Sequence, residues 1–170
     1  MEANKLPEPW LRGTWAEVPA VPRAVLHALE LAEEDLKRLC GTLSDAELNA
    51  RPAGIAPVAF HLQHIARSID RLLTYAEGNQ LSDAQIAAMR SELDAGAKRE
   101  ELFTELDTAL RKGKARIRAF DVARLNEVRA VGKKELPTTL GGLLVHVADH
   151  TQRHVGQAVT TSKIVSAQHS

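Results

Sequence analysis

The stretch Leu143-Leu-Val-His146-Val-Ala-Asp-His150-Thr-Gln-Arg-His154-Val-Gly-Gln157 combines apolar residues at helical spacing with three histidines that stand four positions apart. Residues four positions apart lie on one face of an α-helix, so the stretch predicts an amphipathic helix with a row of imidazoles along one side. We expect this helix to start after Pro137-Thr-Thr139, where a threonine can serve as the N-cap, and to run to about Ser162.

Three further long segments show the same helical periodicity of apolar residues. They span Pro22 to Gly41, Pro57 to Gly78 and Glu100 to Phe120. Ser44 and Ser82 each begin a capping-box pattern, which predicts short helical segments in the connections. Four long amphipathic helices without a convincing pair of strands predict an all-α fold, a four-helix bundle with long connections.

Two parts of the chain do not fit the helical pattern. The first 22 residues contain four prolines, Pro7, Pro9, Pro19 and Pro22, which predict an irregular N-terminal arm. Trp10 and Trp15 are expected to hold this arm against the helical bundle. Residues 121–137 are expected to form a loop, because no second strand-like run is present to pair with the extended pattern at 128–132. The expected organisation is an arm at 1–21, a bundle at 22–162 and a tail at 163–170. The long connections before the third and fourth helices leave the order of the helices open.

The composition narrows the classes of function. The 170 residues, 44% of them apolar, suit one domain, and 22 basic residues balance 22 acidic ones, which argues against a nucleic-acid or anionic-membrane surface built on bulk charge. A single cysteine, Cys40, excludes an internal disulfide and a cysteine-rich zinc module. No signal-peptide or membrane-spanning pattern is present, so we expect a cytoplasmic protein whose partner is a small molecule.

Five of the seven histidines fall in two clusters that can form a metal site. His146 and His154 are about 12 Å apart along a helix axis, so one ion can take either the pair His146/His150 or the pair His150/His154. The third ligand must come from another helix, where His61 and His64 are the candidates. Three protein ligands leave a coordination position open, which is the pattern of catalytic zinc sites.

Two blocks of the sequence closely resemble the DinB/YfiT-like superfamily. They are Phe60-His-Leu-Gln-His64-Ile-Ala-Arg-Ser-Ile-Asp70-Arg-Leu-Leu-Thr-Tyr75-Ala-Glu-Gly78 and the stretch from Leu143 to Gln157 quoted above. The resemblance implies a four-helix bundle that holds one divalent metal ion through three histidines, one on the second helix and two on the last. Carried over to this chain, the ligands are His64, His150 and His154.

The resemblance also implies a range of activities. His61 and His146 become candidates to orient a ligand or to act as a general base. Relatives include metal-dependent transferases that use low-molecular-weight thiols, so a thiol-dependent S-transferase is our first hypothesis and a metal-assisted hydrolase the second. The alternative that is not an enzyme is a stress-related binding or dimerising bundle whose metal is structural or absent. Zinc or nickel suits imidazole ligands, and apolar helix faces allow a homodimer.

Overall fold

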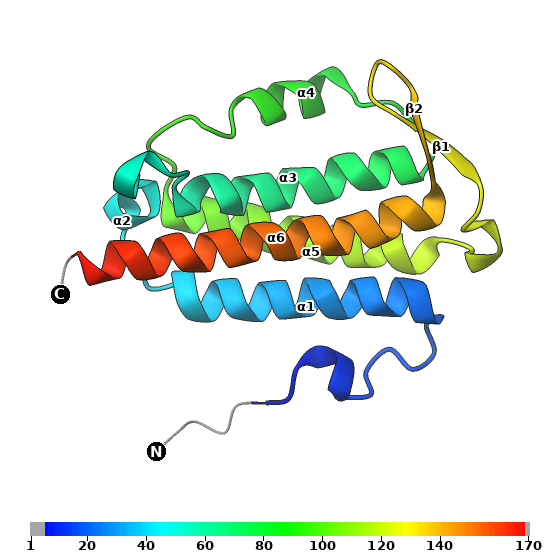
Figure 1. The fold of residues 1–170 in the computed structure, drawn as a ribbon, viewed down its shortest axis with the longest axis horizontal. Coiled ribbons are helices and arrows are strands. Elements are labelled where there is room, and N and C mark those ends of the chain that lie inside the picture. Colours follow the sequence, from blue (N-terminus) through cyan, green and yellow to red (C-terminus); the bar gives the residue numbers. More distant parts are fainter. Residues whose placement is uncertain (1–5, 169–170) are drawn as a thin grey trace.

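A computed structural model describes residues 6–168 and shows four long helices packed side by side (Figure 1). These are α1 (Ala20–Cys40), α3 (Val58–Ala76), α5 (Arg99–Ala119) and α6 (Leu140–Ala167). Helix α6 packs between α1 and α3, and α5 lies against α3 and α1 on the other side. The predicted all-α four-helix bundle is therefore confirmed, with a core of leucine, isoleucine and valine side chains from all four helices.

The order of the helices follows from one long connection. After α3, the chain returns along that helix through α4 (Asp83–Arg90) before α5 begins (Figure 1). Helices α3 and α5 consequently run parallel, while α1 and α6 run in the opposite direction (Figure 1). The connection before α6 instead turns the chain at one end of the bundle, so α6 runs antiparallel to α3.

Local sequence signals place the helix ends. Thr139 is the N-cap of α6, where its side chain accepts a hydrogen bond from the backbone N–H of Gly142. Ser44 and Ser82 form the two predicted capping boxes, at α2 (Asp45–Asn49) and α4. Helix α6 continues to Ala167, five residues beyond the expected end, so most of the segment expected to be a tail is helical.

The expectation of a loop at 121–137 was wrong in part. Strand β1 (Val128–Val131) pairs antiparallel with β2 (Leu136–Thr139), so that Ala130 lies opposite Pro137. The hairpin escaped detection because β2 contains a proline and two threonines and lacks alternating apolar residues. Only Arg129 of the eight strand residues is buried, and Val128 is 73% exposed, so the core imposes no apolar alternation on this part of the sequence.

From residue 6 onward the N-terminal arm is irregular apart from the short 3-10 helix η1 (Pro9–Leu11), while residues 1–5 of the expected arm lie outside the described part of the chain. Helix α1 begins at Ala20, two residues earlier than expected. Trp15 packs against the core, and its indole N–H donates to Glu30 over 2.7 Å. Trp10 is 62% exposed, so Trp15 is the tryptophan that holds the arm in place. No helix within residues 6–168 has the length and apolar content needed to cross a membrane.

Candidate metal centre

Helices α3 and α6 bring three histidines together where they pack side by side. One ring nitrogen from each of His64, His150 and His154 lies within 4.8 Å of one in the other two. His64 Nε2 and His150 Nε2 are 2.8 Å apart, a distance at which the two nitrogens share one proton in a hydrogen bond. Of the two pairs that the sequence left open on α6, the structure therefore brings His150 and His154 together with His64 of α3.

The other two predicted site histidines lie beside this group and outside it. His61 is one turn before His64, is 4% exposed, and places its Nδ1 3.1 Å from Nδ1 of His154. His146 is one turn before His150, with its side chain 44% exposed and its Nδ1 2.8 Å from Asp149. The ring centroids of His146 and His150 are 5.3 Å apart, so His146 adjoins the centre at its more exposed end.

Three of these imidazoles are neutral at pH 7. Burial lowers the pKa of His61, His150 and His154 to about 4 in each case. Repulsion among the histidines adds to this effect, and Arg153 lowers the pKa of His150 and His154 further. A neutral imidazole keeps a lone pair for a metal ion, so His150 and His154 are in the protonation state that metal binding requires.

Glu92 is a site residue that the sequence reasoning missed. Its buried carboxylate, 4% exposed, places Oε2 2.7 Å from Nδ1 of His64 and accepts a 2.5 Å hydrogen bond from Arg71 at Oε1. Burial opposes ionisation of Glu92, but the hydrogen bonds with His64 and Arg71 outweigh it, so its pKa lies below the ordinary value. Glu92 follows α4, 28 positions after His64, and no local pattern marks it.

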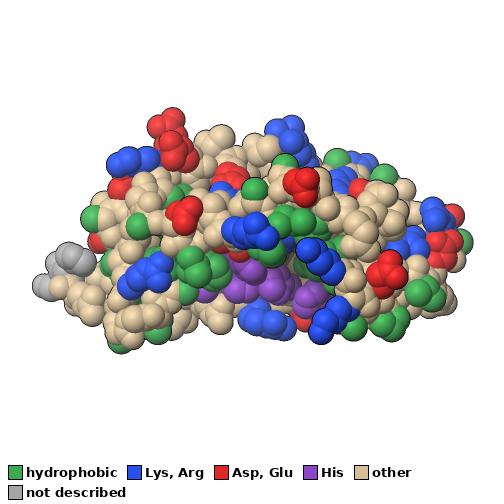
Figure 2. Space-filling view, turned by 90° about the horizontal axis from the view of Figure 1, so that it is seen from above, with side chains coloured by type: hydrophobic (Ala, Val, Ile, Leu, Met, Phe, Trp, Pro, Cys, Tyr) green, Lys and Arg blue, Asp and Glu red, His purple; other side chains and the backbone are tan. Residues whose placement is uncertain are grey.

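The three candidate ligands, His64, His150 and His154, are partly exposed to solvent. Figure 2 shows their side chains in the floor of a trough on one face of the molecule, with hydrophobic side chains and Lys or Arg side chains along its edges. Phe60 stacks on the ring of His64 at 5.2 Å between centroids and approaches His154 edge-on at 6.2 Å. A ligand can therefore reach the histidine nitrogens while an aromatic ring shields one side of the centre.

The donor set fits one divalent metal ion. Two nitrogens that each lie about 2.0 to 2.1 Å from a zinc ion can be separated by at most about 4.2 Å. The three nitrogens meet this requirement after a shift of less than about 1 Å, which rotation of an imidazole supplies. We assign a proton to Nδ1 of His64, which faces the carboxylate of Glu92, and this leaves Nε2 as the ligand atom of His64.

Comparison with known proteins is consistent with this architecture. Residues 28–158 match the family model described as the DinB superfamily. Among solved structures, the crystal structure of a conserved protein from Enterococcus faecalis is similar, with a TM-score of 0.72 and 20% sequence identity. The similarity covers 88% of this chain and 99% of that one, and at this identity it shows a shared fold. No curated protein matches the chain.

Proposed function

Because the chain belongs to the DinB superfamily, we propose that it is a metal-dependent enzyme whose ion is held by His64, His150 and His154. The observation that carries the proposal is the convergence of three imidazole nitrogens, within 4.8 Å of one another, at the floor of a trough open to solvent. Three protein ligands leave a coordination position for a substrate, whereas a structural zinc site has four.

Zinc and nickel are the metals we propose. The ligand set consists of imidazoles, and carboxylate ligands of the kind that favour magnesium or calcium are not part of the three-residue group. When bound, such an ion supplies Lewis-acid chemistry, which lowers the pKa of a thiol or a water molecule that takes the open position. The residues around the group then have to orient the ligands, bind the substrate and accept a proton.

His61 and His146 suit different parts of this work. His61 is buried, has a pKa of about 4 and faces His154, so it is placed to accept a hydrogen bond and orient that ligand. His146 is partly exposed, and its Nδ1 is engaged by Asp149, which leaves Nε2 as the ring atom for proton transfer. We therefore propose His146 as the general base and His61 as the orienting residue.

Thiol-dependent S-transfer is the reaction class we propose, on the strength of the family resemblance and the open coordination position. In this reaction the thiol loses its proton to His146, the sulfur forms a bond to an electrophilic carbon, and the leaving group departs with the electron pair of the broken bond. Arg153 adds positive charge beside His150 and His154, where it lowers the pKa of both, and it also pairs with Asp149 over 3.6 Å.

Metal analysis of the untagged protein is the first test. We expect close to one zinc or nickel ion per chain, loss of the ion in His150→Ala, and retention of the ion in His146→Ala with reduced turnover. Both residues lie on α6 and both changes remove an imidazole, so the two variants are matched. An ion retained in His150→Ala would contradict the site.

Turnover assays then separate the reaction classes. Product formed from an electrophile only when a low-molecular-weight thiol is present supports S-transfer, whereas cleavage of an ester or amide without thiol supports the hydrolase. A protein that binds metal but turns over neither substrate class supports the binding bundle. Val145 and Ile164 are apolar residues exposed on α6, and sedimentation equilibrium tests whether the chain forms the homodimer that such apolar faces allow.

A further inference from the structure

Glu92 lies in the segment between α3 and α5, residues 77–98, which includes α4 and is called the α4 connection below. Through its carboxylate, Glu92 links this connection to the candidate metal centre. Its carboxylate contacts two residues of α3, with Oε2 2.7 Å from His64 Nδ1 and Oε1 2.5 Å from Arg71 Nη1. Both Glu92 and Arg71 are buried, at 4% and 9% exposure. A buried carboxylate held by a guanidinium on one oxygen has little freedom to rotate, so the other oxygen stays aimed at the imidazole.

This contact determines which nitrogen of His64 can bind a metal ion. A carboxylate accepts hydrogen bonds, so Nδ1 carries a proton and Nε2 is the ring nitrogen that can offer a lone pair to a metal ion. Nε2 is the atom that faces His150 across 2.8 Å. A histidine ligand commonly donates its second N–H to a carboxylate, which fixes the ring and raises the basicity of the ligating nitrogen.

We propose that Glu92 is a positioning residue that fixes the tautomer and orientation of His64, and that through this contact metal binding holds the α4 connection in place. The inference rests on the proposed metal-binding function. It adds that metal binding and the attachment of the α4 connection, which is distant from His64 in sequence, strengthen one another.

The α4 connection is attached mainly by polar contacts, which makes such coupling effective. No residue of α4 itself is buried. Gln85 donates to Asp70 over 2.6 Å, and Arg67 donates to the carbonyl oxygen of Ala88 over 2.8 Å. Segments with few buried apolar contacts open at low free-energy cost, so one buried ionic contact is a large part of their attachment. Because coupling free energies are reciprocal, the factor by which Glu92 strengthens metal binding is the factor by which the metal holds Glu92 in place.

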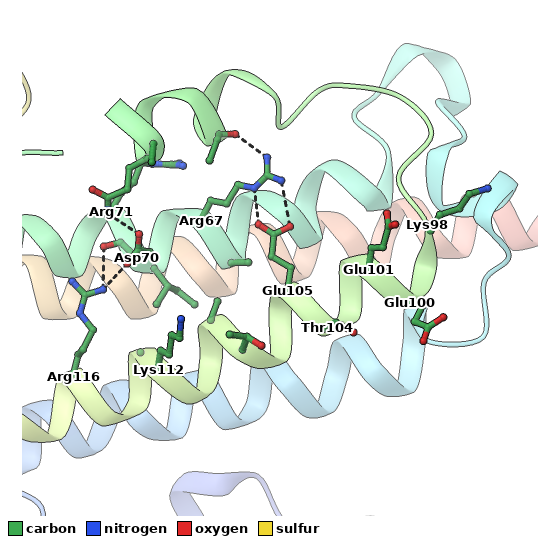
Figure 3. Close-up of a pocket in the computed structure, with 18 residues that line it drawn as sticks. Arg67, Asp70, Arg71, Lys98, Glu100, Glu101, Thr104, Glu105, Lys112 and Arg116 are labelled. Carbon is green, nitrogen blue, oxygen red and sulfur yellow. Dashed lines mark hydrogen bonds and ion pairs between the residues drawn. The ribbon is translucent and has the colours of Figure 1, made fainter. Parts of the chain in front are cut away.

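Arg67 provides a matched control. It lies on α3 one turn before Arg71 and reaches the same connection at Ala88 and Ser91, and it also pairs with Glu105 of α5 (Figure 3). Its guanidinium lines a hollow of about 940 Å³ among α3, α4 and α5, and no histidine within residues 6–168 lines that hollow. Arg67→Met therefore loosens the connection without removing a contact to His64.

The experiment measures the zinc Kd of the full chain by competition with a chromophoric chelator, for the wild type, Glu92→Gln and Arg67→Met. Glu92→Gln keeps the shape of the side chain and removes its charge, and we expect it to raise the Kd about 10- to 100-fold. Arg67→Met should raise the Kd by clearly less than Glu92→Gln does, because it loosens the connection but keeps the Glu92 carboxylate that contacts His64. In hydrogen exchange, zinc should slow the amides of residues 83–95 in the wild type and have little effect on them in Glu92→Gln.

A zinc Kd that is the same in Glu92→Gln and the wild type, or one that rises equally in Arg67→Met, would overturn the proposal. A second measurement needs no variant: long-range ¹H–¹⁵N NMR of the metal-free wild type should show His64 as the Nδ1–H tautomer, and the Nε2–H tautomer would overturn the inference. If the wild type binds no zinc, the proposed function fails, while the tautomer still decides the positioning role of Glu92.

Discussion

Acid should destabilise the metal-free protein well above the pH at which carboxylates protonate. The ordinary pKa of histidine is 6.5, and the pKa values of His61, His150 and His154 in the folded chain are about 4. The unfolded chain therefore binds more protons than the folded chain between these two values. The free energy of unfolding must then fall as the pH falls through this window and rise as the pH rises.

The size of the effect follows from the two pKa values. Between pH 7 and pH 5, one histidine with these values lowers the free energy of unfolding by about 2 kcal/mol. Three such groups would give about 5 to 6 kcal/mol by the same relation. His150 and His154 are only partly buried, and part of each shift comes from repulsion that neutral neighbours do not exert. We therefore expect a total loss of about 3 kcal/mol, a large share of the usual stability of a domain.

Urea unfolding followed by circular dichroism at pH 5, 6 and 7, with a chelator present, measures this loss. His61→Leu replaces the most buried of the three imidazoles with an apolar side chain of similar size and should reduce the loss by about 1 kcal/mol or more. A free energy of unfolding that is constant between pH 7 and pH 5 would refute the reasoning. NMR signals showing that His61 titrates near 6.5 in the folded protein would also refute it.

Two further substitution pairs test the site and the packing. His64→Ala should abolish zinc binding, whereas His61→Ala should weaken zinc binding and still bind one ion per chain at saturating zinc. Isothermal titration calorimetry measures both variants, and loss of binding in His61→Ala with retention in His64→Ala would contradict the assignment of His64 as the ligand. Gly113→Ala should destabilise the protein by about 1 to 2 kcal/mol, because overpacking outweighs the gain in helix propensity; the new Cβ would lie 2.7 Å from Cγ2 of buried Ile69. Gly156→Ala, where nothing lies within 4 Å, should stabilise α6 by about 0.5 to 1 kcal/mol. Thermal unfolding should therefore move the melting temperatures of the two glycine variants in opposite directions, and a shift of both in the same direction would contradict the packing at Gly113 or at Gly156.

The long helices and most of their caps could be read from the sequence alone, whereas the β1–β2 hairpin could not. The apolar periodicity of the four long helices depends on residues three and four positions apart, and the caps at Ser44, Ser82 and Thr139 depend on atoms within one turn. The same local rule placed His150 and His154 one turn apart on one face of α6. These features were readable because their partners are neighbours in the chain.

Tertiary structure decided what depends on partners far apart in the chain. The spacing of the histidines left two pairs on α6 and two candidates on α3, and packing of α3 against α6 brought His64 to His150. The parallel course of α3 and α5 depends on the return path through α4, which also carries Glu92 to His64 across 28 positions. A hydrogen bond or a packed interface between distant segments leaves no periodic trace in either one, because each half satisfies its local preferences without the other.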